Sequence, residues 1–262
     1  MLRIVLTRRW VVRIVGGMVL AAAFVALGMW QLDRNEQRQA RNAMIEENLA
    51  RDPLPVGEVL SVDALAGPSD RWTPVRVSGT YDTANELVIR LRPLDGQRGV
   101  HVLTPLVTDD GAAVLVDRGF VPSAGAEVPE VPAAASGEVE VTGRVRLSEV
   151  GRGTGGDPAS GAIRYVDVAA LAEELPYPLY GGWVELTEQR PPAAAALEPL
   201  PPPEIDAGPH LSYAIQWFAF AVIGIGGFVM LVRTEARLQR EDEQRAAREG
   251  VTEERAAAAR GD

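Results

Sequence analysis

Residues 14–32 read IVGGMVLAAAFVALGMWQL, and residues 211–232 read LSYAIQWFAFAVIGIGGFVMLV. Neither stretch contains an acidic or basic side chain, and each is close to the ~20 residues that a helix needs to cross a ~30 Å hydrocarbon core. A long polar segment separates them. The two stretches therefore predict a membrane protein with an N-terminal transmembrane helix over residues 14–32 and a C-terminal one over residues 210–232.

Arginines flank each predicted span on the side that faces the nearer end of the chain. Arg3, Arg8, Arg9 and Arg13 precede the first span, and Arg233, Arg237 and Arg240 follow the second. Positive residues beside a span stay in the cytoplasm, whereas a long loop is translocated regardless of its charge. We therefore expect a multi-pass protein of the cell membrane with residues 1–13 and the charged tail 233–262 in the cytoplasm. The middle of the chain is then extracytoplasmic.

A cleaved export signal is the alternative interpretation of the first span. Thr7-Arg8-Arg9-Trp10 resembles a twin-arginine start, and a signal of this kind is cut after small residues. The apolar run continues past the small residues at positions 21–23 and reaches Trp30, which suits an aromatic anchor at the outer interface. We therefore favour an uncleaved anchor.

The composition excludes several kinds of chemistry. The chain has no cysteine and no lysine, which rules out structural disulfides, thiolate metal sites, Schiff bases and a P-loop lysine. A net charge of −10 without a basic cluster in the middle of the chain argues against a nucleic-acid partner. The only histidines are His101 and His210, so any imidazole ligand must be one of these two.

Residues 33–190 show the pattern of a β-rich α+β domain. A polar helix is expected to continue from residue 33 to residue 49, and alternating strands then follow, with Asp109-Asp110-Gly111 as a hairpin turn. The expected strands cover residues 75–79, 87–89, 100–107, 114–116, 138–147 and 183–186. Asp167 is placed to cap a short helix. Short, evenly spaced strands predict an antiparallel, barrel-like sheet.

Two further segments carry little folding information. Residues 191–209 are mostly proline, alanine and acidic residues, which predicts an extended spacer that leads back to the membrane. The tail 233–262 alternates arginine and glutamate, as in a solvated helix.

The residues offer little support for an enzyme. Asp109 and Asp110 occupy turn positions, and Asp82 follows a strand end where a turn role is expected. Asp117 is the remaining carboxylate of interest. No serine lies in a nucleophile elbow and no histidine pair has metal-ligand spacing.

The outer ends of the two spans carry a more suggestive set of residues. Trp30, Tyr213 and Trp217 fit an ordinary aromatic belt. Gly17, Ala21 and Gly28 on one helix and Gly224, Gly226 and Gly227 on the other are expected to permit close helix packing. His210 lies at the head of the second span, where a neutral imidazole among aromatic rings could ligate the iron of an apolar metalloporphyrin. Arg34 is the nearest cation by depth and suits a propionate.

Several sequence blocks resemble the Surfeit locus protein 1 family of cytochrome c oxidase assembly factors. The first-span residues are Gly28, Trp30, Gln31 and Arg34. The remaining blocks read VRVSGTYD at 75–82, GVHVLTPL at 99–106, VLVDRGFVP at 114–122 and HLSYAIQW at 210–217. The resemblance covers about residues 20 to 233, with both spans in order.

The resemblance implies a non-enzymatic role in the biogenesis of haem-a-containing oxidase. It implies that haem a is received from haem a synthase and placed in the largest oxidase subunit. It also implies that His210 is the haem ligand. Trp30, Arg34, Tyr213 and Trp217 are the candidate residues around the cofactor because they lie at the same edge of the membrane. Two other hypotheses remain open: an oxidase-associated subunit that docks through its helices without haem, and a membrane-tethered enzyme.

Overall fold

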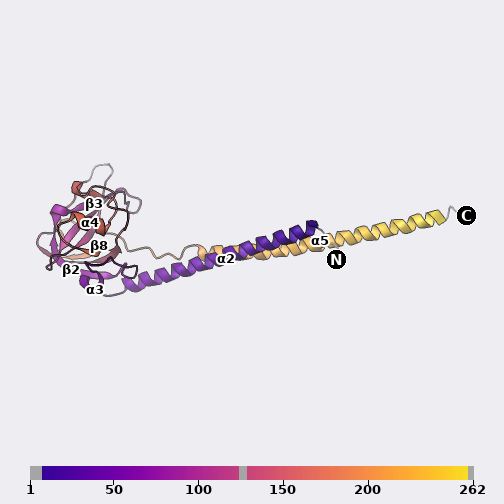
Figure 1. The fold of residues 1–262 in the computed structure, drawn as a ribbon, viewed down its shortest axis with the longest axis horizontal. Helices are drawn as coiled ribbons and strands as arrows, with labels where there is room; N and C mark the ends of the chain where they lie inside the picture. The colour runs from indigo at the N-terminus through magenta and orange to yellow at the C-terminus, as the bar shows by residue number, and fades with distance from the viewer. Residues whose placement is uncertain (1–7, 124–128, 259–262) are drawn as a thin grey trace. The chain divides into compact units, whose positions relative to one another are not determined.

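The computed structural model describes residues 8–123 and 129–258. The predicted features at Arg3 and at the end of the charged tail (259–262) lie outside the described residues. The chain forms two compact units: a helical unit made of Met1–Ala40 and Asp206–Asp262, and a sheet unit made of Arg41–Ile205. Figure 1 labels α2 and α5 in the helical unit and β2, β3, β8, α3 and α4 in the sheet unit.

Two long helices dominate the helical unit. Helix α2 runs over Arg8–Leu49 and helix α5 over His210–Ala258. Each contains an 18-residue window with a mean hydropathy above 2, of which only 6% is buried. A core helix of a soluble domain would hide such a window, so these two helices are consistent with membrane anchoring. The prediction that the first span continues as a polar helix to residue 49 is confirmed.

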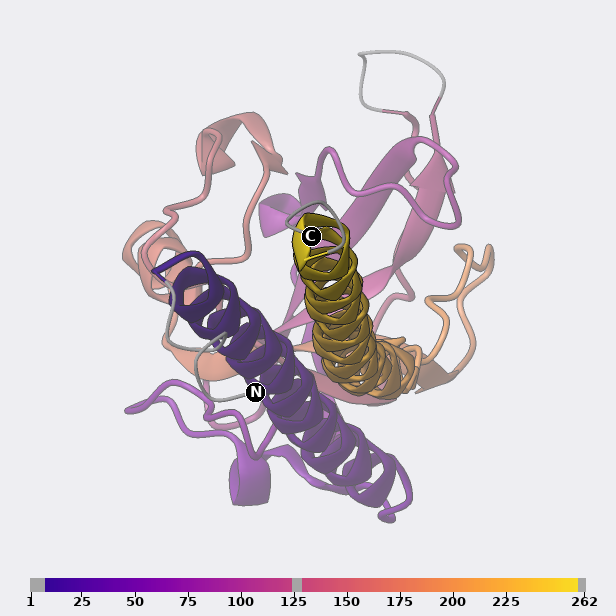
Figure 2. The same cartoon turned by 90° about the vertical axis from the view of Figure 1, so that its right-hand side faces the viewer.

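Helices α2 and α5 lie side by side and run in opposite directions (Figure 2). Gln31 contacts His210, Phe24 contacts Trp217, and Gly17 lies against Phe228. The residue numbers fall along α2 while those of their partners rise along α5, as expected for antiparallel helices. Gln31, Gly28, Phe24 and Gly17 of α2 lie against His210, Phe218, Trp217 and Phe228 of α5. Ile14 and Ala21 of α2, and Ala221 and Gly224 of α5, line the space between the helices. The α2 positions repeat at spacings of three and four, which keeps them on one face of that helix. We call this line of contacts the seam.

Glycines in α2 permit the close approach of the helices, whereas those in α5 do not. A Cβ atom added at Gly28 would lie 2.7 Å from the ring of Phe218, and one added at Gly17 would lie 3.5 Å from Phe228. A Cβ atom at any of the three α5 glycines, 224, 226 and 227, would meet nothing within 4 Å. The predicted role of these α5 glycines in close packing was therefore wrong, because phenylalanine rings from α5 fill the space opposite the α2 glycines.

The described part of the sheet unit, residues 41–123 and 129–205, contains eight strands and two short α-helices. The strands are β1 (Leu54–Pro55), β2 (Pro74–Tyr81), β3 (Leu87–Ile89), β4 (Gly99–Val107), β5 (Ala113–Pro122), β6 (Glu138–Leu147), β7 (Ala162–Ile163) and β8 (Leu179–Arg190). The helices are α3 (Val56–Val59) and α4 (Val168–Glu174), with short 3-10 turns at Thr83–Asn85 and Pro158–Ser160.

The strand order is β1-β2-β6-β8-β5-β4-β3-β7, with an additional pairing of β2 with β4. Three pairs are parallel, namely β1 with β2, β3 with β7 and β5 with β8. The sheet is therefore mixed, and the expectation of a purely antiparallel sheet was wrong. The chain reaches β8 from β5 by way of β6, β7 and α4, and such a crossover allows parallel pairing. The barrel-like closure stays a prediction.

Several local predictions are confirmed. Strands β4 and β5 form an antiparallel hairpin around Asp109, Asp110 and Gly111. The predicted strand over residues 138–147 is β6. The side chain of Asp167 accepts a hydrogen bond from the Ala170 amide and caps α4.

The sheet separates two apolar clusters. Val114 and Val116 of β5 belong to one cluster, together with Val141 and Val184, whereas Leu115 belongs to the other. Neighbouring side chains of a strand point to opposite faces, so β5 is buried on both faces. This explains why its sequence is a continuous apolar run rather than an alternating one.

The proline-rich segment after β8 is docked on the sheet unit in part, whereas the sequence predicted a simple spacer. Phe120 and Glu198 exchange backbone hydrogen bonds of 2.9 and 3.1 Å. The guanidinium of Arg144 donates to the carbonyl oxygens of Leu200 and Pro201 at 3.0 and 3.3 Å. The segment is extended, as expected, but these contacts hold its middle against β5 and β6.

Candidate functional site

His210 is held in place by a side chain from the other helix. Its Nδ1 atom lies 2.9 Å from Oε1 of Gln31. An amide oxygen can only accept a hydrogen bond, so Nδ1 is the donor, and in the neutral ring Nε2 then keeps its lone pair. An imidazole fixed through one nitrogen in this way is oriented to act as a ligand through the other.

A second pair of contacts fixes the chain just before His210. The guanidinium of Arg38 donates to the backbone oxygen of Asp206 at 2.8 Å, and its ion pair with the Asp206 carboxylate measures 3.4 Å. Gly208 adopts a φ of +66° and its amide donates to the same carboxylate at 2.8 Å. Arg38 and Gln31 are seven residues apart, which is two helical turns on one face of α2. The head of α5 is therefore attached to α2 at two levels.

Three aromatic rings pack together further along the seam. The rings of Phe24 and Trp217 are stacked with centroids 5.8 Å apart, and Phe220 lies 5.9 Å from each. Trp217 is seven residues after His210, about 10 Å along α5. Trp217 thus lies on the same helix face as His210 and forms an apolar wall below it.

The remaining predicted site residues lie on the exposed surface of the helices. The guanidinium of Arg34 lies 5.8 Å from the ring of Trp30 and donates to Gln37 at 3.1 Å. Trp30 and Tyr213 are each nearly half exposed. Within residues 8–123 and 129–258, no hydrogen bond or ring contact joins any of these three residues to His210. The structure therefore brings His210 together with Gln31, and Trp30 together with Arg34, as two separate pairs.

The family model described as the SURF1 family matches residues 18–222 of this chain. An uncharacterized SURF1-like protein of Mycobacterium tuberculosis is 32% identical over 224 residues, which cover 84% of this chain and 81% of that protein. Surfeit locus protein 1 of Xenopus tropicalis is 30% identical over 175 residues, covering 60% of this chain and 56% of that protein. The human Surfeit locus protein 1 is 31% identical over 141 residues, or 47% of this chain and 45% of that protein.

This chain belongs to the SURF1 family. The family is known in general for oxidase assembly, which agrees with the resemblance seen in the sequence. The matched region extends from the first apolar helix into the second.

The sheet unit of this SURF1-family chain contains a row of buried polar side chains. His101 Nδ1 lies 2.9 Å from the Asp117 carboxylate, and that carboxylate also accepts from the Gly119 amide at 3.1 Å. Asp117 is opposite Glu185 on β8, and Glu185 is opposite Arg144 on β6. Asp117 is fully buried. His101 pairs with Asp117, and Glu185 forms an ion pair with Arg144 at 3.8 Å. These residues lie on four neighbouring strands, β4, β5, β8 and β6, so we assign them a structural role.

The other candidate polar residues of the domain also have structural partners. Arg118 is buried and donates to Glu86 and to the Pro132 carbonyl, each at 2.7 Å. Asp82 accepts from the Ala84 amide and caps the 3-10 turn at Thr83–Asn85, which confirms its predicted turn role.

Sequence reasoning missed two contributors to the site. Gln31 was quoted only as part of the family resemblance, and Phe24 was not singled out. Both belong to the row of α2 residues, spaced three and four apart, that runs from Gln31 toward the N-terminus of the helix. Counting this repeat in both spans would have placed Gln31 and Phe24 on the contact face.

The buried row predicts a pH dependence of stability. Burial raises the pKa of Glu185 above its ordinary value; Asp117 adds to the rise, and the Arg146 guanidinium opposes it without cancelling it. The folded state therefore binds this proton more tightly than the unfolded chain does. The resulting stabilisation is complete below the unfolded pKa of about 4.3 and is lost as pH rises through the folded pKa. We expect Glu185→Gln to flatten this decline in urea unfolding monitored by tryptophan fluorescence.

The matched control is Glu188→Gln, because Glu188 is an exposed carboxylate on the same strand. It should leave the pH profile unchanged. A Glu185→Gln profile that still declines like the wild type would contradict the assignment.

Proposed function

We propose that this chain assists the assembly of haem-a-containing cytochrome c oxidase by holding haem a at the rim formed by His210 and Gln31. The cargo would come from haem a synthase and go to the largest oxidase subunit. Family membership supports the assembly role. The orientation of His210 by Gln31 is the observation that supports haem a as the cargo. We propose no catalytic step for the chain itself.

The residues at the rim fit the chemistry of a haem. His210 would hold the haem iron through Nε2, and the Arg34 guanidinium, which has no carboxylate partner among the residues that the structure describes, would pair with a propionate. Trp30, Tyr213 and Trp217 offer aromatic surface to the ring. In the oxidase the haem supplies redox chemistry; in this chain the residues only bind, orient and shield it.

The proposed topology gives this rim a location. With both termini cytoplasmic, the head of α5 lies at the outer face of the membrane, and the sheet unit is extracytoplasmic. Membrane lipid then surrounds the seam below His210. Accessibility labelling of single cysteines introduced at residue 95 and in the tail tests this arrangement, since the native chain has no cysteine.

We expect His210→Ala to remove haem a from the protein. Wild-type protein purified from cells that make haem a should show a Soret band, and the variant should retain less than about a tenth of it, because loss of the axial ligand leaves only ring and propionate contacts. Gln31→Leu should lower occupancy by about tenfold, the usual effect of removing a group that orients a ligand. Ser212→Ala, an exposed change in the same turn of α5, is the control.

Two other outcomes have defined meanings. If the wild type carries no Soret band while a strain lacking the protein still loses oxidase activity, the chain acts as a docking companion without haem. If the deletion strain keeps an unaltered oxidase spectrum, the assembly role is wrong.

A further inference from the structure

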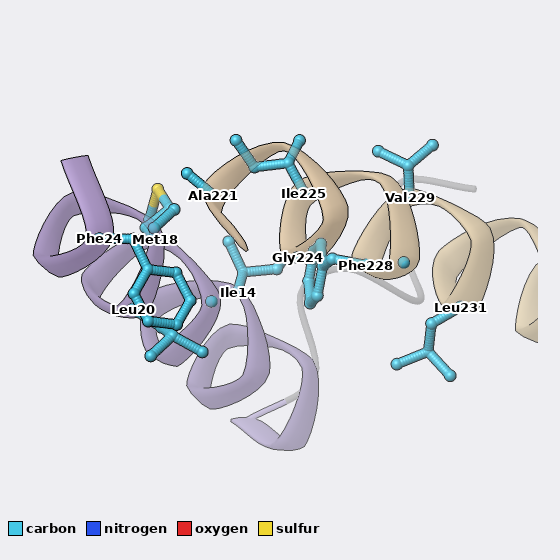
Figure 3. A pocket seen from close by; sticks show the side chains of 13 residues that line it. Ile14, Met18, Leu20, Phe24, Ala221, Gly224, Ile225, Phe228, Val229 and Leu231 are labelled. Carbon is cyan, nitrogen blue, oxygen red and sulfur yellow. The ribbon is translucent and has the colours of Figure 1, made fainter. Parts of the chain in front are cut away.

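An apolar cavity of about 520 Å³ lies between α2 and α5, below the aromatic group of Phe24, Trp217 and Phe220. Figure 3 shows its walls: Ile14, Met18 and Phe24 come from α2, and Ile225, Phe228 and Leu231 from α5. Every lining side chain is hydrocarbon, thioether or glycine. No lining side chain can donate or accept a strong hydrogen bond, and burying a polar ligand group there would be unfavourable. The cavity is therefore suited to a hydrocarbon chain.

Two α5 glycines create the space. Gly224 and Gly227 both line the cavity, and a Cβ atom at either would meet nothing within 4 Å. They are three residues apart and so lie on the same side of the helix. Gly226 lies between them in sequence, also has open space at its Cβ position, and is not part of the lining. The cavity thus depends on two particular glycines rather than on all three.

The cavity and the rim belong to one continuous seam. Ala221, the first α5 residue of the lining, is eleven residues after His210, about 16 Å along the helix. The rings of Phe24, Trp217 and Phe220 occupy the interval between them. A hydrocarbon tail of a ligand held at His210 would therefore meet apolar surface along the helices before it reaches the cavity. A volume of this size is in the range of small-molecule sites.

We propose that this cavity holds the isoprenoid tail of the haem a bound at His210, an inference that rests on the proposed function. Haem a carries such a tail, whereas protohaem does not. The cavity would therefore let the protein select haem a over protohaem by its tail rather than by its iron. A lipid acyl chain has compatible chemistry, but it has no group that would anchor it to the rim at the other end of the seam.

The test compares two haems on cavity-filling variants. We expect purified wild-type protein to bind haem a at least tenfold more tightly than protohaem in a Soret titration. The double variant Gly224→Leu, Gly227→Leu should bind the two haems with similar affinity, because leucine side chains occupy the volume of the tail. Gly226→Leu is the matched control and should keep the wild-type preference. Circular dichroism of each variant confirms that the helices are retained.

The failure of this inference is distinct from the failure of the proposed function. If wild-type protein binds both haems equally through His210, or if Gly226→Leu acts like the double variant, the tail site is wrong and the haem-binding rim stands. If neither haem binds the wild type, both are wrong.

A haem-free probe gives a second readout. A photoreactive farnesol analogue should label peptides that contain Met18 or Phe228, and haem a should block the labelling more strongly than protohaem. The double variant should show a severalfold lower yield. Equal competition by the two haems would overturn the assignment.

Discussion

Replacing Gly119 with alanine is expected to lower the free energy of unfolding by about 3 to 4 kcal/mol. Gly119 lies at a bulge, since Val102 of β4 is opposite Gly119 and Leu103 is opposite Asp117, which leaves Arg118 without an opposite residue. Its φ is +134°, a conformation that is almost restricted to glycine. A Cβ atom would also lie 2.7 Å from the Glu198 carbonyl oxygen.

Moving the Glu198 carbonyl away from an alanine Cβ atom at position 119 would itself be costly. The Glu198 carbonyl accepts from the Phe120 amide at 2.9 Å, so moving Glu198 away to make room would break the hydrogen bonds that dock the proline-rich segment. Alanine at position 119 must therefore either strain the bulge or release this segment. The loss is large relative to a total stability of about 5 to 15 kcal/mol.

Urea unfolding of the purified protein measures this effect, with Gly111→Ala as the matched control. Gly111 also has a positive φ, of +83°, but a Cβ atom there would meet nothing within 4 Å. The control should cost only about 1 to 2 kcal/mol, the conformational part of the penalty. Equal losses in the two variants would show that contact with Glu198 contributes nothing.

Replacing Asp117 with asparagine is expected to cost about 3 kcal/mol. The Asp117 carboxylate accepts hydrogen bonds from His101 Nδ1 and from the Gly119 amide, and it is fully buried. The asparagine oxygen can still accept from the Gly119 amide, but its NH2 group can only donate to His101, which requires the ring to move its proton from Nδ1 to Nε2. Nε2 is buried and has no hydrogen-bond partner among the described residues, so this tautomer leaves a buried donor unsatisfied.

Thermal unfolding and steady-state protein level in membranes both measure the Asp117→Asn effect. Asp109→Asn is the control, since Asp109 lies exposed in the β4–β5 turn and should change stability by less than about 0.5 kcal/mol. The comparison also addresses the enzyme hypothesis. If Asp117→Asn abolished a catalytic activity while protein level and stability stayed normal, the structural assignment would be wrong.

The local pattern of the chain predicted many individual elements well. Uncharged apolar runs predicted both long helices, because crossing a bilayer demands a length and a composition that few other segments have. The Asp109-Asp110-Gly111 turn and the Asp167 cap depend on hydrogen bonds between close neighbours, which sequence spacing determines directly. Strand β6 was predicted at its observed bounds because apolar and polar residues alternate along it.

Other features depend on residues far apart in the sequence. The parallel pairing of β5 with β8 and the docking of Glu198 against Phe120 join segments separated by more than sixty residues. Neither has a local pattern, because main-chain hydrogen bonds carry no side-chain signature. The contact of Gly119 with residue 198 likewise became visible only in the fold.

The candidate site divides in the same way. The sequence by itself determined that the chain carries two membrane-compatible helices, that His210 heads the second, and that the chain resembles the SURF1 family, because these depend on composition, order and motif. Only the tertiary structure decided that Gln31 orients His210, that the α2 glycines rather than the α5 glycines make the close approach, and that a cavity remains between the helices. Those features depend on which face of one helix meets which face of the other, and that choice follows from the fit of Phe218 and Phe228 against Gly28 and Gly17.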